Sequence, residues 1–204
     1  MVRELRHPVL VHKLSRIRDI RTPKETLRSL LREIGSFMVY ELLSDLQIGE
    51  REIETWLGVR SFPFVREEEV VFVAVLRAGL PMLEGALSVL PGASTGFLAV
   101  KRDEETLESR VFYTRLPDLA GRRVVILDPM LATGGTLISS LREVVERKPS
   151  QTVSVHIVCA PEGIERVRER FPQHRLFTVS VDEGLNSRGY IVPGLGDMGD
   201  RLYS

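Results

Sequence analysis

One cysteine and the lack of any long apolar run are the clearest deficits of this sequence. Cys159 is the single cysteine among 204 residues, and it stands inside an apolar stretch. One thiol excludes a disulfide framework and a thiolate metal site, so we expect a small buried core side chain here. No stretch approaches the roughly 18 apolar residues of a membrane span, and the N-terminus lacks the apolar core of a signal peptide. These absences predict a soluble, cytoplasmic protein with no membrane partner.

An excess of charge of one sign is also missing. The 28 Lys and Arg residues balance the 28 Asp and Glu residues, and the isoelectric point is near 6.9. A domain that binds nucleic acid over a broad surface carries a surplus of basic residues. The composition therefore disfavours a nucleic-acid partner and leaves open only a local basic patch. Hydrophobic residues at 43% and charged residues at 27% are ordinary values for a folded domain.

What the sequence does contain is an alternation of apolar runs and helical patterns. Val70–Leu76 and Val124–Leu127 hold no polar residue, which is typical of strands buried on both faces of a parallel sheet. Further strands are expected at residues 94–100, 153–160 and 176–181. Helix-period segments separate the strands, which predicts right-handed β-α-β crossovers. The expected fold is α/β, with a mainly parallel central sheet flanked by helices.

The chain reads as one domain over residues 1–204, because no linker, repeat or low-complexity segment divides it. A chain of this length buries a substantial core unaided. We expect an N-terminal helical or arm region over residues 1–69, an α/β core over residues 70–181 and a tail over residues 182–204.

The first 69 residues show helix signals but no visible chemistry. Thr22 as N-cap, Pro23 at the first helical position and Glu25 closing a capping box predict the start of a long helix. We expect this helix in the core or at a dimer interface. Gly35 inside it costs about 1 kcal/mol relative to alanine, which tertiary packing can offset or exploit for close approach. In the mixed segment that follows, Trp56 is expected to be an apolar anchor.

The most informative stretch is Asp128–Thr136, which reads DPMLATGGT between an expected strand and an expected helix. This arrangement points backbone N–H groups and the positive end of the helix dipole at an anion. Gly134 and Gly135 let the main chain approach a phosphate, and the hydroxyls of Thr133 and Thr136 can donate hydrogen bonds. The lysine of an ATP-type P-loop and the glycine pattern of a dinucleotide site are both absent. A phosphate site is predicted here, with an ordinary strand-to-helix turn as the alternative.

This run resembles the loop of the phosphoribosyltransferases that binds 5-phosphoribosyl-1-diphosphate (PRPP). Most members of that superfamily carry two adjacent acids at the strand end, whereas here the second is Pro129, as in the uracil-specific branch. The resemblance implies a type I phosphoribosyltransferase fold with a β-hairpin hood and a C-terminal base-binding loop. It implies that Asp128 meets the ribose hydroxyls and that residues 132–136 hold the 5′-phosphate. The PRPP-binding residues that it implies in this run are Asp128, Pro129, Met130, Leu131, Ala132, Thr133, Gly134, Gly135 and Thr136.

Two arginines follow other strand ends. Arg77, in the run LRAGL, stands where open α/β folds place ligand contacts, with a solvated or core-capping arginine as the alternative. Arg102 opens a charged run that is similar to the Arg-x-Glu-Glu-Thr-Leu segment of the same family, which lies on a mobile hood. The resemblance implies that both arginines reach the diphosphate and that the hood excludes water when it closes.

The tail carries five glycines among apolar residues, which argues against a helix or a regular strand. A wrapped loop with exposed N–H and C=O groups suits a pyrimidine edge, and a frayed terminus is the alternative. The segment GYIVPGLGDMGDRLY resembles the uracil-binding end of uracil phosphoribosyltransferases. The resemblance implies uracil contacts, mainly through the main chain, from Ile191, Gly196, Asp197 and Met198, with Asp197 also facing PRPP. Met198 stands where the family often has a smaller residue.

Taken together, the resemblance implies conversion of uracil and PRPP to UMP and diphosphate in pyrimidine salvage. It implies Mg²⁺ as cofactor, held mainly by PRPP and water because Mg²⁺ sites often use few protein ligands. No residue is a certain catalytic group, and Arg102 and Asp197 are the best candidates. A nucleotide effector such as GTP or CTP and a homodimer or higher homo-oligomer are further expectations. The rival interpretations are a phosphoribosyltransferase for another base, an RNA-binding regulator on the same fold and a phosphosugar-binding module without catalysis.

Overall fold

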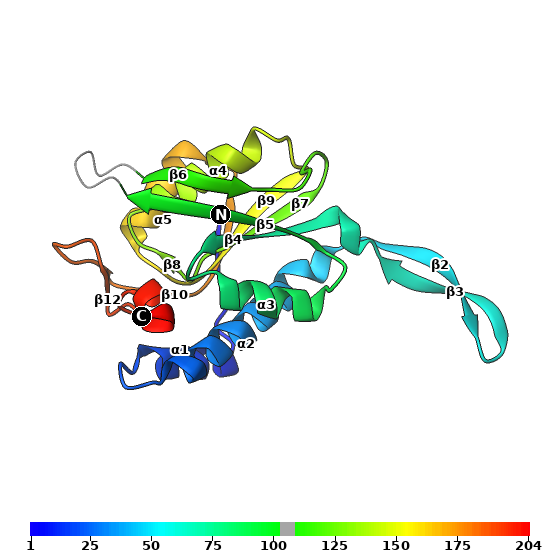
Figure 1. Ribbon diagram of the computed structural model, residues 1–204, viewed down its shortest axis with the longest axis horizontal. Coiled ribbons are helices and arrows are strands. Elements are labelled where there is room, and N and C mark those ends of the chain that lie inside the picture. Colours follow the sequence, from blue (N-terminus) through cyan, green and yellow to red (C-terminus); the bar gives the residue numbers. More distant parts are fainter. Residues whose placement is uncertain (103–108) are drawn as a thin grey trace.

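The computed structural model describes residues 1–102 and 109–204, and of Arg102 it describes the backbone only. An eight-stranded sheet forms its centre (Figure 1). The main path of the sheet runs β1-β10-β9-β7-β4-β5-β6, every neighbouring pair is parallel except β5 with β6, and the short β8 pairs with β9. The expected α/β fold is confirmed. The strands are β1 (Val2–Glu4), β4 (Val70–Leu76), β5 (Ser94–Arg102), β6 (Ser109–Arg115), β7 (Arg123–Leu127), β8 (Met130–Leu131), β9 (Gln151–Cys159) and β10 (Arg175–Val181).

Helices cover both faces of the sheet, and alternate residues of β4 show why. Phe72 and Ala74 face a core that contains α1 (Pro8–Arg18), α2 (Lys24–Leu42) and α3 (Leu80–Val89). Val71 and Val73 face a second core, beneath α4 (Gly135–Val145) and α5 (Pro161–Arg170). Successive side chains of a strand point to opposite faces, so an unbroken apolar run supplies both layers. Figure 1 shows the two helix layers on either side of the sheet. None of the helices in the described ranges is long and apolar enough to span a membrane.

The long helix α2 packs closely on α3 through glycines. A Cβ on Gly35 would lie 2.8 Å from the backbone of Met82, and one on Gly85 would collide with the carbonyl oxygen of Arg32. The prediction that Gly35 allows close approach is confirmed. The predicted capping box is wrong, because the N-cap is Pro23, whose side chain makes no capping hydrogen bond. The hydroxyl of Thr22 instead donates to the carbonyl of Arg16, 2.7 Å away at the end of the preceding helix.

Between α2 and the central strands, a two-stranded ribbon leaves the body of the molecule. Strands β2 (Ile48–Thr55) and β3 (Gly58–Val65) pair antiparallel along their whole length and project as an arm (Figure 1). Trp56, in the turn at the end of this arm, is 91% exposed. The expectation that Trp56 anchors the fold is therefore wrong, because its side chain lies at the end of an arm that projects away from the described body of the molecule. Short 3₁₀ helices, η1 (Leu43–Asp45) and η2 (Glu67–Glu69), flank the arm.

The tail is more regular than its glycines suggest. It contains a small antiparallel pair, β11 (Gly184–Leu185) with β12 (Ile191–Val192), and ends in helix α6 (Met198–Tyr203). The prediction that glycine content excludes a helix here is wrong. The carboxylate of Asp197 accepts a hydrogen bond from the backbone N–H of Asp200 at 2.9 Å, and this N-cap starts the helix.

Candidate active site

The residues predicted to bind ligands gather at one edge of the sheet. Strands β4, β5 and β7 are parallel neighbours, so Arg77, the backbone of Arg102 and Asp128 all follow or close a strand at its carboxyl end. A Cβ on Gly79 would collide with the carbonyl oxygen of Leu127. The turn that carries Arg77 thus touches the backbone just before Asp128. This edge is where open α/β sheets bind their ligands.

The predicted phosphate loop ends in an uncapped helix. Gly134 has φ 81° and ψ −10°, a left-handed conformation that side chains rarely adopt, and it precedes the first residue of α4. Gly134, the N-cap, has no side chain with which to cap the helix, so among the described residues the N–H groups of the first turn are available to an anion. The geometry therefore suits a phosphate group at residues 132–136.

Neighbouring elements hold this loop in place. A Cβ on Gly163, in the first turn of α5, would collide with the carbonyl oxygen of Ala132. The guanidinium of Arg166 donates to the carbonyl of Thr133 at 3.3 Å. On the other side, Ser139 donates to the carbonyl of Ser109 at 2.6 Å, which joins α4 to the start of β6. The loop is thus packed between α5 and the β5–β6 hairpin.

Asp128 is the half-buried carboxyl group between these parts. Its Oδ1 accepts from the backbone N–H of Met130 at 3.5 Å, a long contact. Removal from water disfavours the charged carboxylate and raises the pKa of Asp128 to about 7. Beneath it, His156 is fully buried, and neither ring nitrogen has a hydrogen-bond partner in the described part of the chain. Burial and the neighbouring His174 imidazole lower the pKa of His156 to about 3, so this imidazole is neutral.

Arg77 connects this edge of the sheet to the tail. Its Nη2 lies 3.3 Å from Oδ1 of Asp200, and its guanidinium lies over the ring of Tyr203, 5.7 Å from the centroid. More than half of the Arg77 side chain is exposed to solvent. A cation in this position is free to exchange its carboxylate partner for an incoming anion, because exposed ion pairs are worth little.

The predicted uracil contacts lie in the same tail segment. Ile191 is buried, whereas Gly196, with φ 71°, and Asp197 are exposed. The side chain of Met198 is fully buried in the core that includes Leu202. Met198 can therefore offer a ligand its main chain but hardly its side chain.

The hood lies partly outside the described residues. Strands β5 and β6 form an antiparallel hairpin in which Arg102 pairs with Ser109, and the predicted Glu-Glu-Thr-Leu run falls in residues 103–108, which are not described. A shallow pocket lies between this hairpin and the end of β4. It is bounded by Leu76, Arg77, Ala99, Val100, Phe112 and Tyr113.

Sequence reasoning missed several residues that support the site. Arg166 carried no signal, since it stands in an ordinary charged segment, whereas Asp200 lies inside the tail segment GYIVPGLGDMGDRLY but was not singled out there. Asp182 did carry one, because it follows β10 at the same edge of the sheet at which Asp128 follows β7. Its partner Arg18 lies in the first helix, far from any motif.

Comparison with known proteins agrees with this geometry. The family model for uracil phosphoribosyltransferase matches residues 4–204. A uracil phosphoribosyltransferase of Aquifex aeolicus is 53% identical over 204 residues, covering 100% of this chain and 98% of the relative. One from Acinetobacter baylyi is 41% identical, covering 99% of this chain and 96% of the relative.

Solved structures agree as well. A protein from Aquifex aeolicus, 54% identical, superposes with a TM-score of 0.96 and covers 100% of this chain and 98% of its own. A hypoxanthine-guanine phosphoribosyltransferase from Bacillus anthracis, at 14% identity, has a TM-score of 0.53, with coverage of 78% and 80%, and shares the fold. The chain belongs to the uracil phosphoribosyltransferase family.

Proposed function

We propose that this protein transfers the phosphoribosyl group of PRPP to uracil, giving UMP and diphosphate, as a step of pyrimidine salvage. The observation that carries the proposal is the meeting of three parts at one sheet edge. These are the uncapped start of α4, the cation of Arg77 and an ordered tail with exposed main-chain groups. The helix start suits the 5′-phosphate, the cation suits the diphosphate, and the main-chain groups of the tail suit the base.

In the proposed reaction the bond between ribose C1 and the diphosphate oxygen breaks while a bond from uracil N1 to C1 forms. The N1 proton of uracil is released. The start of α4 holds the 5′-phosphate, the Asp128 carboxylate holds the ribose hydroxyls, and Arg77 and Arg102 stabilise the negative charge of the departing diphosphate. The rate then comes from positioning and charge stabilisation and needs no protein nucleophile.

The proposal includes Mg²⁺. In the described ranges, no three His, Cys, Asp or Glu side chains are arranged to hold a metal ion together. The carboxylates of Asp128 and Asp197 are the protein groups proposed at the site, and so few ligands suit a cation held chiefly by substrate oxygens and water. When bound, Mg²⁺ supplies positive charge to the diphosphate.

Uracil is recognised, in this proposal, by the main chain of the tail. Exposed N–H and C=O groups around Gly196 can pair with the two carbonyl oxygens and the N3–H of the base, and Ile191 supplies an apolar contact. The buried side chain of Met198 keeps α6 in place behind them.

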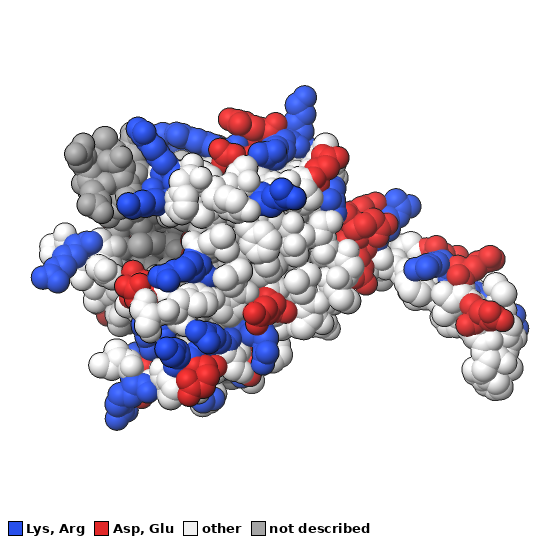
Figure 2. Space-filling view, viewed as in Figure 1, with Lys and Arg blue, Asp and Glu red and all other residues white. Residues whose placement is uncertain are grey.

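The arm supports a further part of the proposal, self-association into a homodimer or higher homo-oligomer. An isolated two-stranded ribbon is only marginally stable in water. This one carries exposed Trp56, Leu57 and Val59 near its turn, and Figure 2 shows basic and acidic side chains along it and an uncharged far end. Mixed charge with an apolar end suits a second copy of this chain, the usual partner in symmetric assemblies.

Two further points rest on resemblance to the family. We propose that the enzyme works in the cytoplasm and that a nucleotide such as GTP or CTP regulates it. Sedimentation and activity with and without each nucleotide test the second point.

The first test is formation of UMP from radiolabelled uracil, PRPP and Mg²⁺, beside cytosine, hypoxanthine, guanine and orotate. We expect turnover of uracil and of none of the other four bases. Asp128→Ala should lose the turnover of uracil. If a different base is turned over, that base is the substrate in place of uracil. PRPP binding without any turnover would point to a binding module, and a salt-sensitive shift of RNA would point to the regulator.

A further inference from the structure

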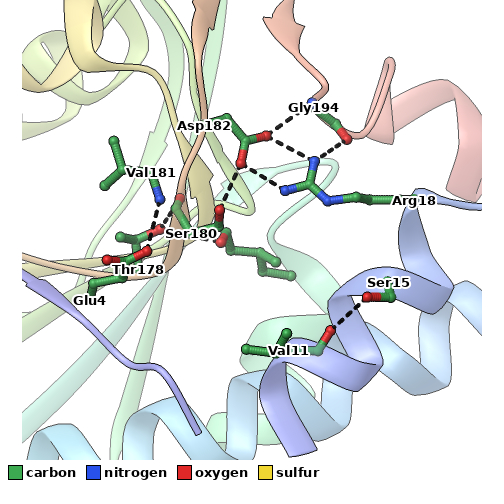
Figure 3. A network of polar contacts seen from close by, with 10 residues as sticks. Glu4, Val11, Ser15, Arg18, Thr178, Ser180, Val181, Asp182 and Gly194 are labelled. Carbon is green, nitrogen blue, oxygen red and sulfur yellow. Dashed lines mark hydrogen bonds and ion pairs between the residues drawn. The ribbon is translucent and has the colours of Figure 1, made fainter. Parts of the chain in front are cut away.

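The end of the first helix is tied to the base-binding tail by a buried ion pair (Figure 3). Arg18, the last residue of α1, donates from Nη1 to Oδ2 of Asp182 at 2.8 Å and from Nη2 to Oδ1 at 2.7 Å. The Asp182 side chain is 2% exposed and that of Arg18 is 24% exposed. Two parallel bonds of this kind fix direction as well as distance.

The same pair holds both polar main-chain atoms of one tail residue. The backbone N–H of Gly194 donates to Oδ2 of Asp182 at 3.0 Å, and its carbonyl accepts from Nη1 of Arg18 at 2.8 Å. Gly194 has φ 58°, and a Cβ there would collide with the carbonyl oxygen of Ile191. Ser180 completes the group by donating to Oδ1 of Asp182 at 2.7 Å. Figure 3 shows the guanidinium and the carboxylate converging on Gly194.

A second arginine holds the next residue to the same helix end. Arg201, in α6, donates from Nη1 to the carbonyls of Ile17 and Leu195, each at 2.8 Å. Its Nη2 donates to the carbonyl of Asp19 at 2.9 Å. Residues 194 and 195 are thus fixed immediately before Gly196, around which the proposed function places the main-chain contacts to uracil.

Stability alone does not account for this arrangement. A buried ion pair gains little over well-packed apolar side chains, because removing both charges from water offsets their attraction. What charged groups add here is direction, since each bond to Gly194 sets the orientation of its peptide groups. Desolvation opposes the charge of Asp182, but hydrogen bonds from Arg18, from Ser180 and from the N–H of Gly194 hold its pKa below the ordinary value.

We propose that Arg18 and Asp182 are positioning residues for the base, which set the main-chain geometry of residues 194–196 so that uracil affinity depends on the end of α1. This inference rests on the proposed function, because it takes the tail main chain as the surface that binds uracil. It assigns a role to the N-terminal region, in which the sequence shows no chemistry.

The test compares Arg18→Lys and Asp182→Asn with a matched control. Arg123→Lys is that control, because Arg123 is 18% exposed and pairs with Asp45 at 2.6 Å, at the start of β7 and thus at the opposite edge of the sheet. The KM values for uracil and PRPP, kcat, and PRPP binding by calorimetry are measured for each. In both Arg18→Lys and Asp182→Asn we expect the KM for uracil to rise about tenfold, a loss of about 1.4 kcal/mol in binding free energy, with PRPP affinity unchanged. The control Arg123→Lys should change neither the KM for uracil nor the affinity for PRPP.

Two further measurements separate positioning from loss of fold. In Arg18→Ala, added guanidinium ion should lower the raised KM for uracil, because it can occupy the place of the lost group. Hydrogen exchange of the amides of residues 184–197 should be faster in Arg18→Lys than in Arg123→Lys.

If Arg18→Lys and Asp182→Asn both fold and leave the KM for uracil unchanged, the inference is overturned. An equal rise in the KM values for uracil and PRPP would overturn it as well. An unmodified chain that makes no UMP would overturn the proposed function and, with it, the role in base binding. In that case hydrogen exchange still decides whether Arg18 orders the tail.

Discussion

The guanidinium of Arg77 lies 3.3 Å from the carboxylate of Asp200, so the residue that directly follows the central strand β4 meets helix α6 of the tail. One partner belongs to the proposed diphosphate site, and the other follows the proposed uracil segment by two residues. The two halves of the site are thus in contact before any substrate binds. The pair is exposed on both sides, which makes it easy to exchange.

This contact predicts opposite effects for its two members. Arg77→Gln should weaken PRPP binding by at least about tenfold, because a charge-assisted bond to the diphosphate is lost. Asp200→Asn should tighten PRPP binding about twofold, since it removes both a competing partner of Arg77 and a negative charge near the diphosphate. Calorimetry with PRPP measures both. Arg168→Gln, which breaks an exposed pair with Glu165 on α5, is the matched control and should change nothing. Weaker binding in Asp200→Asn would show that this carboxylate holds Arg77 in place.

The raised pKa of Asp128 predicts a pH dependence of stability. Its carboxyl has a pKa of about 7 in the folded chain against 3.8 for the free group, so the folded state holds the proton more tightly. The contribution of this carboxyl to stability is present below the free-group pKa of 3.8 and is lost as the pH rises through the folded pKa of about 7. Asp128→Asn stays neutral and should therefore be more stable than the parent near pH 8, by a few kcal/mol at most, at ~1.4 kcal/mol per pKa unit. Urea unfolding from about pH 5 to pH 8 measures the difference, which should shrink toward low pH.

The parent-minus-variant comparison is needed because a buried histidine acts in the other direction. The lowered pKa of His156 removes stability as pH falls below the 6.5 of a free imidazole. That slope is common to both proteins and cancels in the difference. A difference that does not change with pH would contradict the assignment to Asp128.

The central strands and the conformation of the strand-to-helix loop were predictable because their signals are local. The expected strand Val70–Leu76 has the same bounds as β4, since burial on both faces needs an unbroken apolar run. The loop at residues 132–136 was predictable because glycines and a helix start are adjacent in sequence. The Arg18–Asp182 pair was not, because its partners are 164 residues apart and only the packing of α1 beside β10 joins them. The cap at Thr22 failed for a different reason, since the carbonyl of Arg16 in the preceding helix, close in sequence, takes its hydroxyl.

The backbone of the phosphate loop gives a third prediction. Gly134→Ala should cost about 1 kcal/mol or more in stability, because φ 81° is unfavourable for a residue with a side chain, and it should weaken PRPP binding. Gly121→Ala is the control, since Gly121 has φ 69° with open space around it and precedes the start of β7, far from the loop. Both variants should lose stability in urea, and Gly134→Ala should lose more, because its Cβ would lie 3.0 Å from the carbonyl oxygen of Gly163. Equal PRPP affinity in the two variants would argue against phosphate binding at this loop.

The exposed end of the arm gives the last prediction, which concerns assembly. Burial of a tryptophan side chain in an interface stabilises it by a few kcal/mol, and such residues often dominate the affinity. Because Trp56 is 91% exposed in a single chain, Trp56→Ser should weaken self-association by about tenfold or more and leave the unfolding of the monomer unchanged. Sedimentation over a range of protein concentrations measures the shift. Ile20→Ser is the matched control, because Ile20 is 88% exposed but lies in the turn between α1 and α2, away from the arm. If both variants sediment as the parent does, the arm is not the interface. If the parent itself is monomeric at all concentrations, the proposed self-association fails, and the apolar end of the arm must serve a different partner.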